Sequence, residues 1–195
     1  AEDTAGAWHM TGISIGVDTG RTDNLAGAGG FGQGGERVRV DAASGRLQLR
    51  RRDDMRVSVG PDIELLRSYN SQRDDGDNWR FGYARRLHGR NGTLNAPGSS
   101  VRRTDEDGVE RVWRYDAGRA AYVERSGGGA DDLLRFDPVG GTGVWTDGDS
   151  QREEHYDAAG RLQAVRDPDG QALTLAYDDA GRLSAVTGAS GETRH

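Results

Sequence analysis

A stretch near the C-terminal end of the sequence repeats with a fixed spacing. Residues 156–162 read YDAAGRL, and residues 177–183, 21 positions later, read YDDAGRL. Weaker copies of the aromatic-Asp pair begin at Tyr115 and Phe136, so about four units follow one another at intervals of 20 or 21 residues. A short period of this kind is typical of a chain built from copies of one supersecondary unit. The sequence therefore predicts a repetitive scaffold.

Each unit predicts one β-hairpin. In the segment 157–160, the Asp side chain can accept bonds from nearby amides, and Gly160 can supply the positive φ that ends a hairpin loop. The segment 167–170 fits a type I turn, with Pro168 fixing φ at the second position. Residues 172–177 and 182–187 alternate apolar with small or polar side chains, as half-buried strands do. A single hairpin is unstable in water, so neighbouring units must stack. A glycine precedes each aromatic by about seven residues, at Gly108, Gly129, Gly148 and Gly170.

The rest of the chain also predicts strands, and we find no convincing amphipathic helix. Alternating or β-rich segments lie at 10–17, 37–40, 46–50, 55–59, 63–69 and 79–83. Residues 26–35 are rich in glycine but lack the Lys and the following helix of a phosphate-binding loop, so we interpret them as a flexible linker. We predict an all-β fold of antiparallel hairpin repeats, stacked into a curved sheet or partial β-shell. Its parts would be a Gly-rich N-terminal segment (1–36), a β domain leading into the repeats (37–90) and the hairpin array (91–195).

Composition and charge narrow the classes of function. The net charge of -6 argues against nucleic acid as the main partner, because phosphate neutralisation needs a clustered positive surface. The chain has no Cys, so disulfides and thiolate chemistry are excluded. No stretch approaches the roughly 18 apolar residues of a membrane helix. Residues 1–4 (AEDT) resemble an end exposed by signal-peptide removal, and we expect export.

Titratable residues offer few candidates for catalysis or metal binding. No two of the four histidines have metal-ligand spacing, and the carboxylates cluster in turns, where hairpin chemistry already explains an Asp before a Gly. The loop at 74–78 could supply some calcium ligands but lacks the full calcium-loop pattern, so calcium is a weak prediction and no other cofactor is expected. A hydrolase using paired turn carboxylates is a further alternative. The histidines are His9, His88, His155 and His195, and the calcium candidates are Asp74, Asp75, Asp77 and Asn78.

Aromatic residues divide into core and contact candidates. Packing between repeats accounts for the aromatics of the array, namely Trp113, Tyr115, Phe136, Tyr156 and Tyr177. Exposed aromatics on a sheet can stack on sugar rings or on a partner chain. Trp8 and Trp79 are the candidates for such a ligand-binding role.

The two YD motifs identify the chain as similar to RHS/YD-repeat proteins. The segments before the repeats resemble the N-terminal region of bacterial Rhs and polymorphic-toxin proteins: the strand at 40–47, LRSYNS at 66–71 and WRFG at 79–82. The resemblance covers residues 37–195. It implies a bacterial secreted or cell-surface protein, in a family whose long arrays wind into a hollow β-shell around a toxin or make cell contacts. The segment 137–141 (DPVGG) imitates the family's closing motif but lacks its Leu and lies inside a repeat.

With about four units the chain cannot enclose a toxin, so it is either the opening segment of a longer protein or a short relative with another task. We predict a non-catalytic structural scaffold, not an enzyme. Its partners would be other YD repeats of the same or a neighbouring chain, which pair with an exposed strand edge. Possible further partners are a cell-surface glycan or protein, and the alternative function is a carbohydrate- or cell-surface-binding module using exposed aromatics.

Overall fold

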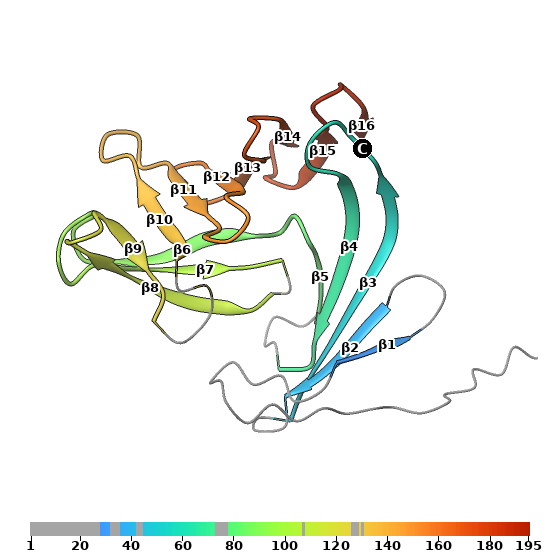
Figure 1. Cartoon of the computed structure of the whole chain (residues 1–195), viewed down its shortest axis with the longest axis horizontal. Coiled ribbons are helices and arrows are strands. Elements are labelled where there is room, and N and C mark those ends of the chain that lie inside the picture. The colour runs from blue at the N-terminus through green and yellow to red at the C-terminus, as the bar shows by residue number, and fades with distance from the viewer. Residues whose placement is uncertain are drawn as a thin grey trace, which may run out of the picture.

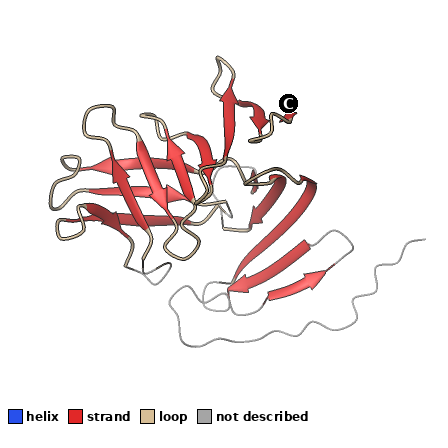
Figure 2. Cartoon of the chain, turned by 45° about the horizontal axis from the view of Figure 1, so that its top comes forward, coloured by secondary structure: helices blue, strands red, loops and turns tan. Residues whose placement is uncertain are grey.

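The computed structural model describes residues 28–31, 36–41, 45–72, 78–106, 108–125, 129 and 131–195. All regular structure in these ranges is β-strand (Figure 2). The strands form two antiparallel sheets, and in both sheets each strand lies beside the strands that precede and follow it in the chain. Such a meander is the arrangement that successive hairpins produce, so the predicted all-β, antiparallel fold is confirmed. The predicted strand at 10–17 lies outside the described residues.

The first sheet has five strands, and it corrects two predictions. Residues 28–31 are a strand rather than a flexible linker, since their backbone pairs with residues 36–39 and a ladder needs no side chains. The predicted strands at 46–50 and 55–59 form one long strand that ends at Arg56, with a register shift between Arg52 and Asp54. Such a bulge absorbs an extra residue without ending the strand. The five strands are β1 (Ala28–Phe31), β2 (Glu36–Asp41), β3 (Arg46–Arg56), β4 (Ile63–Asn70) and β5 (Trp79–Phe81).

The second sheet has eleven strands and contains the repeats. In every unit the aromatic-Asp pair ends one strand and begins the turn to the next. The two clearest copies build the same turn: Gly160 donates to the Asp157 carbonyl (2.9 Å), and Gly181 donates to the Asp178 carbonyl (2.8 Å). The predicted hairpins are therefore confirmed. The strands are β6 (Arg86–Asn91), β7 (Ser100–Thr104), β8 (Glu110–Asp116), β9 (Ala121–Val123), β10 (Leu133–Phe136), β11 (Gly143–Thr146), β12 (Glu153–Tyr156), β13 (Leu162–Arg166), β14 (Ala172–Tyr177), β15 (Leu183–Thr187) and β16 (Thr193–Arg194).

The larger sheet curls back on its own first strand. The Leu87 amide in β6 donates to the Gly160 carbonyl at 2.8 Å, and Arg86 and Arg161 form an isolated antiparallel bridge. Figure 1 shows the consequence, because β10–β13 turn over β6–β8 instead of continuing in their plane. The contact is a single bridge and not a ladder, so the sheet is curved but open.

One hydrophobic core serves both sheets. Ile63 of β4 and Tyr83, which follows β5, belong to the same buried cluster as the inward side chains of the larger sheet. The aromatics assigned to packing lie there: Trp113, Phe136 and Tyr156 are buried, and Tyr115 and Tyr177 pack against them. Residues 86–91 pair with the repeats in the larger sheet. The change of sheet therefore falls between β5 and β6, whereas the domain boundaries proposed above remain predictions.

Candidate functional site: a buried chain of ion pairs

Two strands of the larger sheet direct charges of opposite sign into the core. Side chains alternate across a strand, and in β7 this alternation buries Val101 and Arg103, whereas in β12 it buries Glu154 and Tyr156. Glu154 is 2% exposed. Because the sheet curls, residues 51 positions apart in sequence meet inside it.

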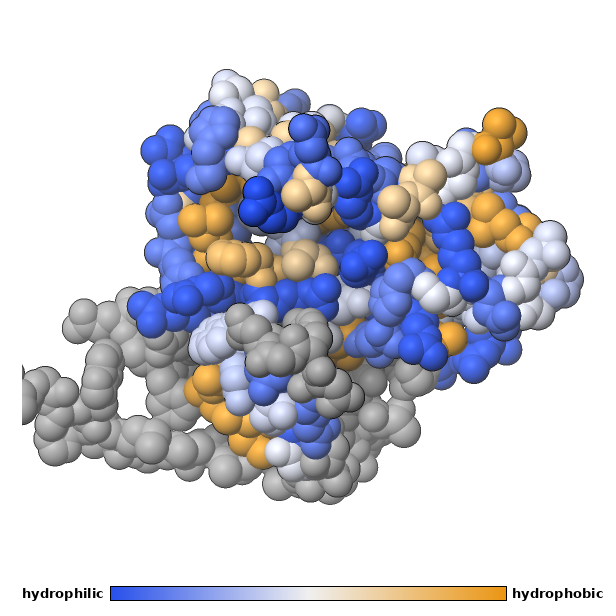
Figure 3. Space-filling model, turned by 180° about the vertical axis from the view of Figure 1, so that it is seen from behind, coloured by the Kyte–Doolittle hydropathy of each residue, from blue (hydrophilic) through white to orange (hydrophobic). Residues whose placement is uncertain are grey.

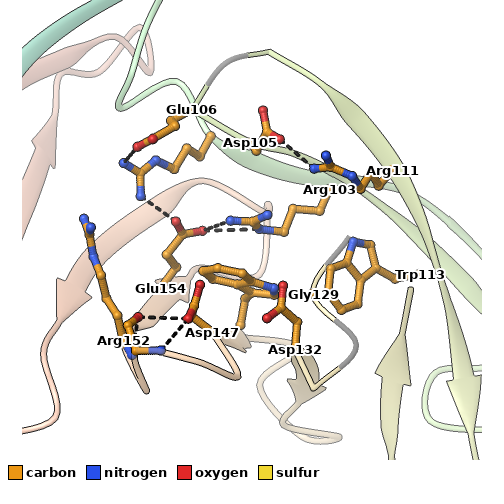
Figure 4. A pocket seen from close by; sticks show the side chains of 13 residues that line it. Arg103, Asp105, Glu106, Arg111, Trp113, Gly129, Asp132, Asp147, Arg152 and Glu154 are labelled. Atoms are coloured by element: carbon orange, nitrogen blue, oxygen red, sulfur yellow. Dashed lines mark hydrogen bonds and ion pairs between the residues drawn. The ribbon is translucent and has the colours of Figure 1, made fainter. Parts of the chain in front are cut away.

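Glu154 is held by two arginines. Its Oε2 accepts from Arg103 Nη2 at 2.7 Å, and its Oε1 accepts from Arg85 Nη1 at 2.5 Å. The Tyr156 hydroxyl also donates to Oε2. Arg85 reaches the site from the segment between β5 and β6, where its Nε also donates to the Gly82 carbonyl at 3.0 Å. Each polar atom of the carboxylate is thus satisfied by a charged or hydroxyl donor (Figure 4).

The pairs continue from the core to the first sheet. Arg85 Nη2 donates to Glu106 Oε2 at 2.7 Å, and Glu106 Oε1 accepts from Arg50 Nη2 of β3 at 2.6 Å. We name this alternating series, Arg50–Glu106–Arg85–Glu154–Arg103, the ion-pair chain. It joins both sheets and four separate segments of sequence, so it fixes how the first sheet sits on the repeat array.

The electrostatics of the site follow from burial and pairing. Burial alone would raise the pKa of Glu154, but the charges of Arg103 and Arg85 outweigh it and lower the pKa to about 2. Burial would lower the pKa of Arg103, yet Glu154 and Tyr156 raise it above its ordinary value. Burial raises the pKa of Tyr156, and the neighbouring Glu154 adds to this. All three groups therefore keep one protonation state through the neutral range.

A cavity of about 340 Å³ opens beside the ion-pair chain. Arg103 forms part of its wall, with its guanidinium carbon 3.8 Å from the ring centroid of Trp145. Trp113 borders the cavity from β8, and Asp132 and Arg111 contribute further polar groups (Figure 4). We refer to this space as the tryptophan cavity.

The turn carboxylates have structural partners. Asp157 Oδ1 accepts from the Arg161 amide and its Oδ2 from Arg161 Nε, both at 2.8 Å. Asp178 and Arg182 repeat both bonds at the same distances. The Arg of the YDxAGR motif thus clamps the Asp that starts the turn. Within the described ranges, no three His, Cys, Asp or Glu residues are grouped so that they could hold a metal ion.

Of the residues predicted to bind ligands, only Trp79 and Asn78 are described. Trp79 lies in β5 of the first sheet and is 40% exposed. Its ring contacts Tyr69 (5.4 Å between centroids) and Arg67 (5.5 Å). The Asn78 carbonyl accepts from the Asn70 amide at 3.0 Å and so extends the pairing of β4. Trp8, Asp74, Asp75 and Asp77 lie outside the described residues.

Sequence reasoning missed the ion-pair chain, although one signal of it was present. The residue two positions before the YD aromatic points inward in every unit, and it is Trp113, Leu134, Glu154 and Leu175 in turn. A carboxylate at a position where the sibling units have Trp or Leu marks a buried charge. That comparison would have identified Glu154, but not its arginine partners.

The structure defines an all-β repeat protein, in which a 21-residue hairpin unit extends a curved antiparallel sheet. Comparison with known families agrees: the family model described as RHS Repeat matches residues 156–193, the two clearest copies. The predicted RHS/YD repeats are thus confirmed over residues 156–193. No curated protein matches it. The RHS-repeat family is associated in general with structural roles at the cell surface or outside the cell. The part of the chain that the structure describes contains no helix with the length and hydropathy to cross a membrane.

Proposed function

We propose that this chain is a non-catalytic structural segment of a secreted or cell-surface protein and forms part of the wall of a β-shell. The observation that carries the proposal is the reuse of the motif residues. Asp157 and Asp178 start equivalent turns, and Gly160 and Gly181 complete them with φ of 79° and 75°. A motif whose residues are all occupied in building each hairpin has no side chain left for chemistry.

The ion-pair chain supports the same role. Buried charges that hold one protonation state contribute to orientation and not to turnover, and here they connect the first sheet to the array. The outer surface fits a protein wall in water: on the face drawn in Figure 3, hydrophobic areas are small and lie among hydrophilic residues. Such a surface is typical of a solvated protein.

The partners in this proposal are further YD repeats of the same or a neighbouring chain. Among the described strands, β16 has one neighbour, β15, so its other edge offers unpaired backbone groups. In the family, arrays of this kind enclose a toxin or mediate cell contact, and a wall segment fits either task.

Duplicating one unit tests the scaffold proposal. A second copy of residues 156–176, inserted between Ala176 and Tyr177, preserves the period of the array. If repeats add as independent modules, the insertion yields a monomer with a urea m-value larger by about a tenth, because m scales with the surface exposed on unfolding. A Gly/Ser-rich insert of equal length at the same place is the control and should leave m unchanged.

Two results would contradict the proposal. The first is a duplicated unit that behaves like the Gly/Ser insert and is removed by limited proteolysis. The second is turnover of a glycoside or ester panel that a single Asp157→Asn substitution abolishes, which would show that turn carboxylates are catalytic.

A further inference from the structure

The tryptophan cavity contains two indole hydrogen-bond donors that have no acceptor among the described residues. Trp113 is 2% exposed and Trp145 is 8% exposed. Both indole Nε1 atoms are buried, and neither has a hydrogen-bond partner among the described residues. Both residues line the same cavity. An indole N–H buried without an acceptor costs free energy, so two at one place call for an explanation.

Packing alone does not explain these two donors. Two buried polar groups beside them are paired: Arg103 with Glu154, and Tyr156 also with Glu154. The Nε atom of Arg152, which also lines the cavity, is a further buried donor without an acceptor among the described residues. Another buried hydroxyl of the core, that of Tyr122, lies 2.9 Å from Ser99 Oγ. A molecule in the cavity with acceptor atoms facing β8 and β11 would satisfy both indoles.

The remaining lining limits the chemistry of that molecule. Asp132 is partly buried, and its Oδ1 accepts from the Gly148 amide at 2.9 Å, which leaves Oδ2 for a donor. Charges around the cavity nearly balance, with four arginines against five carboxylates, so there is little selection for an ion. The ligand must accept from indoles and donate to a carboxylate, as a hydroxyl group does. The charged residues are Arg85, Arg103, Arg111 and Arg152, and Asp105, Glu106, Asp132, Asp147 and Glu154.

We propose that the tryptophan cavity binds a neutral saccharide, with one sugar ring inside it. Its volume of about 340 Å³ is near the lower end of the roughly 300–1,000 Å³ of small-molecule sites, and its lining is more polar than usual. Since Arg103 covers one face of the Trp145 ring, the sugar is recognised through indole N–H edges. This site is distinct from the exposed Trp79, and it does not depend on the scaffold function.

Nuclear magnetic resonance of the full chain tests the proposal directly. With ¹⁵N-labelled tryptophan, each of the four Trp residues gives one indole N–H signal, assigned by single Trp→Phe variants. The probes are methyl glycosides of glucose, galactose, mannose and N-acetylglucosamine, followed by their β-linked disaccharides. At least one probe should shift the Trp113 and Trp145 signals while the Trp79 signal stays fixed. Tighter binding of a disaccharide identifies a glycan chain as the source, and equal binding identifies a free sugar.

Variants separate recognition from folding. Trp113→Phe removes one N–H and keeps an aromatic ring, so affinity should fall about threefold to tenfold. Asp132→Asn should weaken binding by a similar factor, and Trp79→Phe, the matched control on the other sheet, should leave it unchanged. If Trp113→Phe does not fold, the wild-type titration and Asp132→Asn still decide. The proposal is overturned if no saccharide moves the two signals, or if acetate or a neutral tripeptide moves them as strongly as any sugar.

Discussion

The substitution Glu154→Gln tests whether the ion-pair chain holds the two sheets together. Gln has the shape of Glu, so the change creates no cavity and removes one negative charge from between Arg103 and Arg85. Breaking a buried pair by removing one partner costs about 3–5 kcal/mol, because it leaves a buried charge uncompensated. Arg85 keeps Glu106, whereas Arg103 loses its carboxylate partner.

The pKa of Glu154 gives a second route to the magnitude. Its value is about 2 in the folded protein against an ordinary 4.5. A difference of about 2.5 units corresponds to roughly 3 kcal/mol at neutral pH. The folded pKa is depressed, so this stability is present above pH 4.5 and is lost as the pH falls toward 2. Both routes give a large share of the about 5–15 kcal/mol that stabilises a typical domain.

Urea unfolding at pH 7, followed by tryptophan fluorescence, measures the effect. We expect Glu154→Gln to lower the free energy of unfolding by about 3 kcal/mol and to flatten its dependence on pH below 4.5. Asp178→Asn is the control: it alters an ion pair with the exposed Arg182 and should cost much less than Glu154→Gln, because solvent screens exposed pairs. If Glu154→Gln and Asp178→Asn cost the same, the ion-pair chain does not stabilise the fold and the reasoning fails.

Four further substitutions test other features of the array. Tyr156→Phe removes a hydrogen bond to a buried carboxylate and should cost about 1.5–3 kcal/mol in the same urea experiment, with the fold intact by circular dichroism. Gly160→Ala would place Cβ 1.9 Å from the Leu87 carbonyl oxygen, whereas at Gly181 the nearest atom to such a Cβ is an arginine nitrogen at 3.6 Å. Because φ is positive at both positions, Gly181→Ala should lower the free energy of unfolding by about 1–2 kcal/mol. Gly160→Ala should lower it clearly more in the same urea experiment. Burial raises the pKa of Asp132, so this one residue contributes stability at low pH that is lost as the pH rises above 3.8. Asp132→Asn should therefore melt higher than the wild type at pH 7, and this advantage should vanish at pH 3.

The hairpins could be predicted because their determinants are local. Asp157 and Gly160 are three residues apart and form the same turn, so the order of residue types in this short segment is enough to predict the turn. The alternation at 172–177 likewise predicts which side chains of β14 are buried, with Leu173 and Leu175 inside. The prediction of a separate strand at 55–59 is wrong because its determinant is not local. The bulge that continues β3 depends on pairing with the distant β4.

The ion-pair chain could not be predicted because it depends on curvature. Arg103 and Glu154 meet only if the sheet turns back on β6, where Leu87 contacts Gly160 and Arg86 pairs with Arg161. Nothing in the sequence near either residue encodes that contact. Arg85 lies between β5 and β6, outside any strand. The alternation of side chains along a strand therefore does not predict which way the Arg85 side chain points.

Identical motifs acquire different roles in this array through their neighbours. Leu162 and Leu183 hold the same place in YDxAGRL, yet Leu162 is 0% exposed and Leu183 is 39% exposed. β6 contacts the turn just before Leu162, and within the described ranges its backbone makes no such bond or bridge to the turn of the next unit. The repeat therefore specifies the hairpin, and the segment before the array specifies which hairpin is buried. Functional or stabilising side chains are therefore expected where one unit has a different residue type from the other units at a buried position. Glu154 is such a residue, since the equivalent positions hold Trp or Leu.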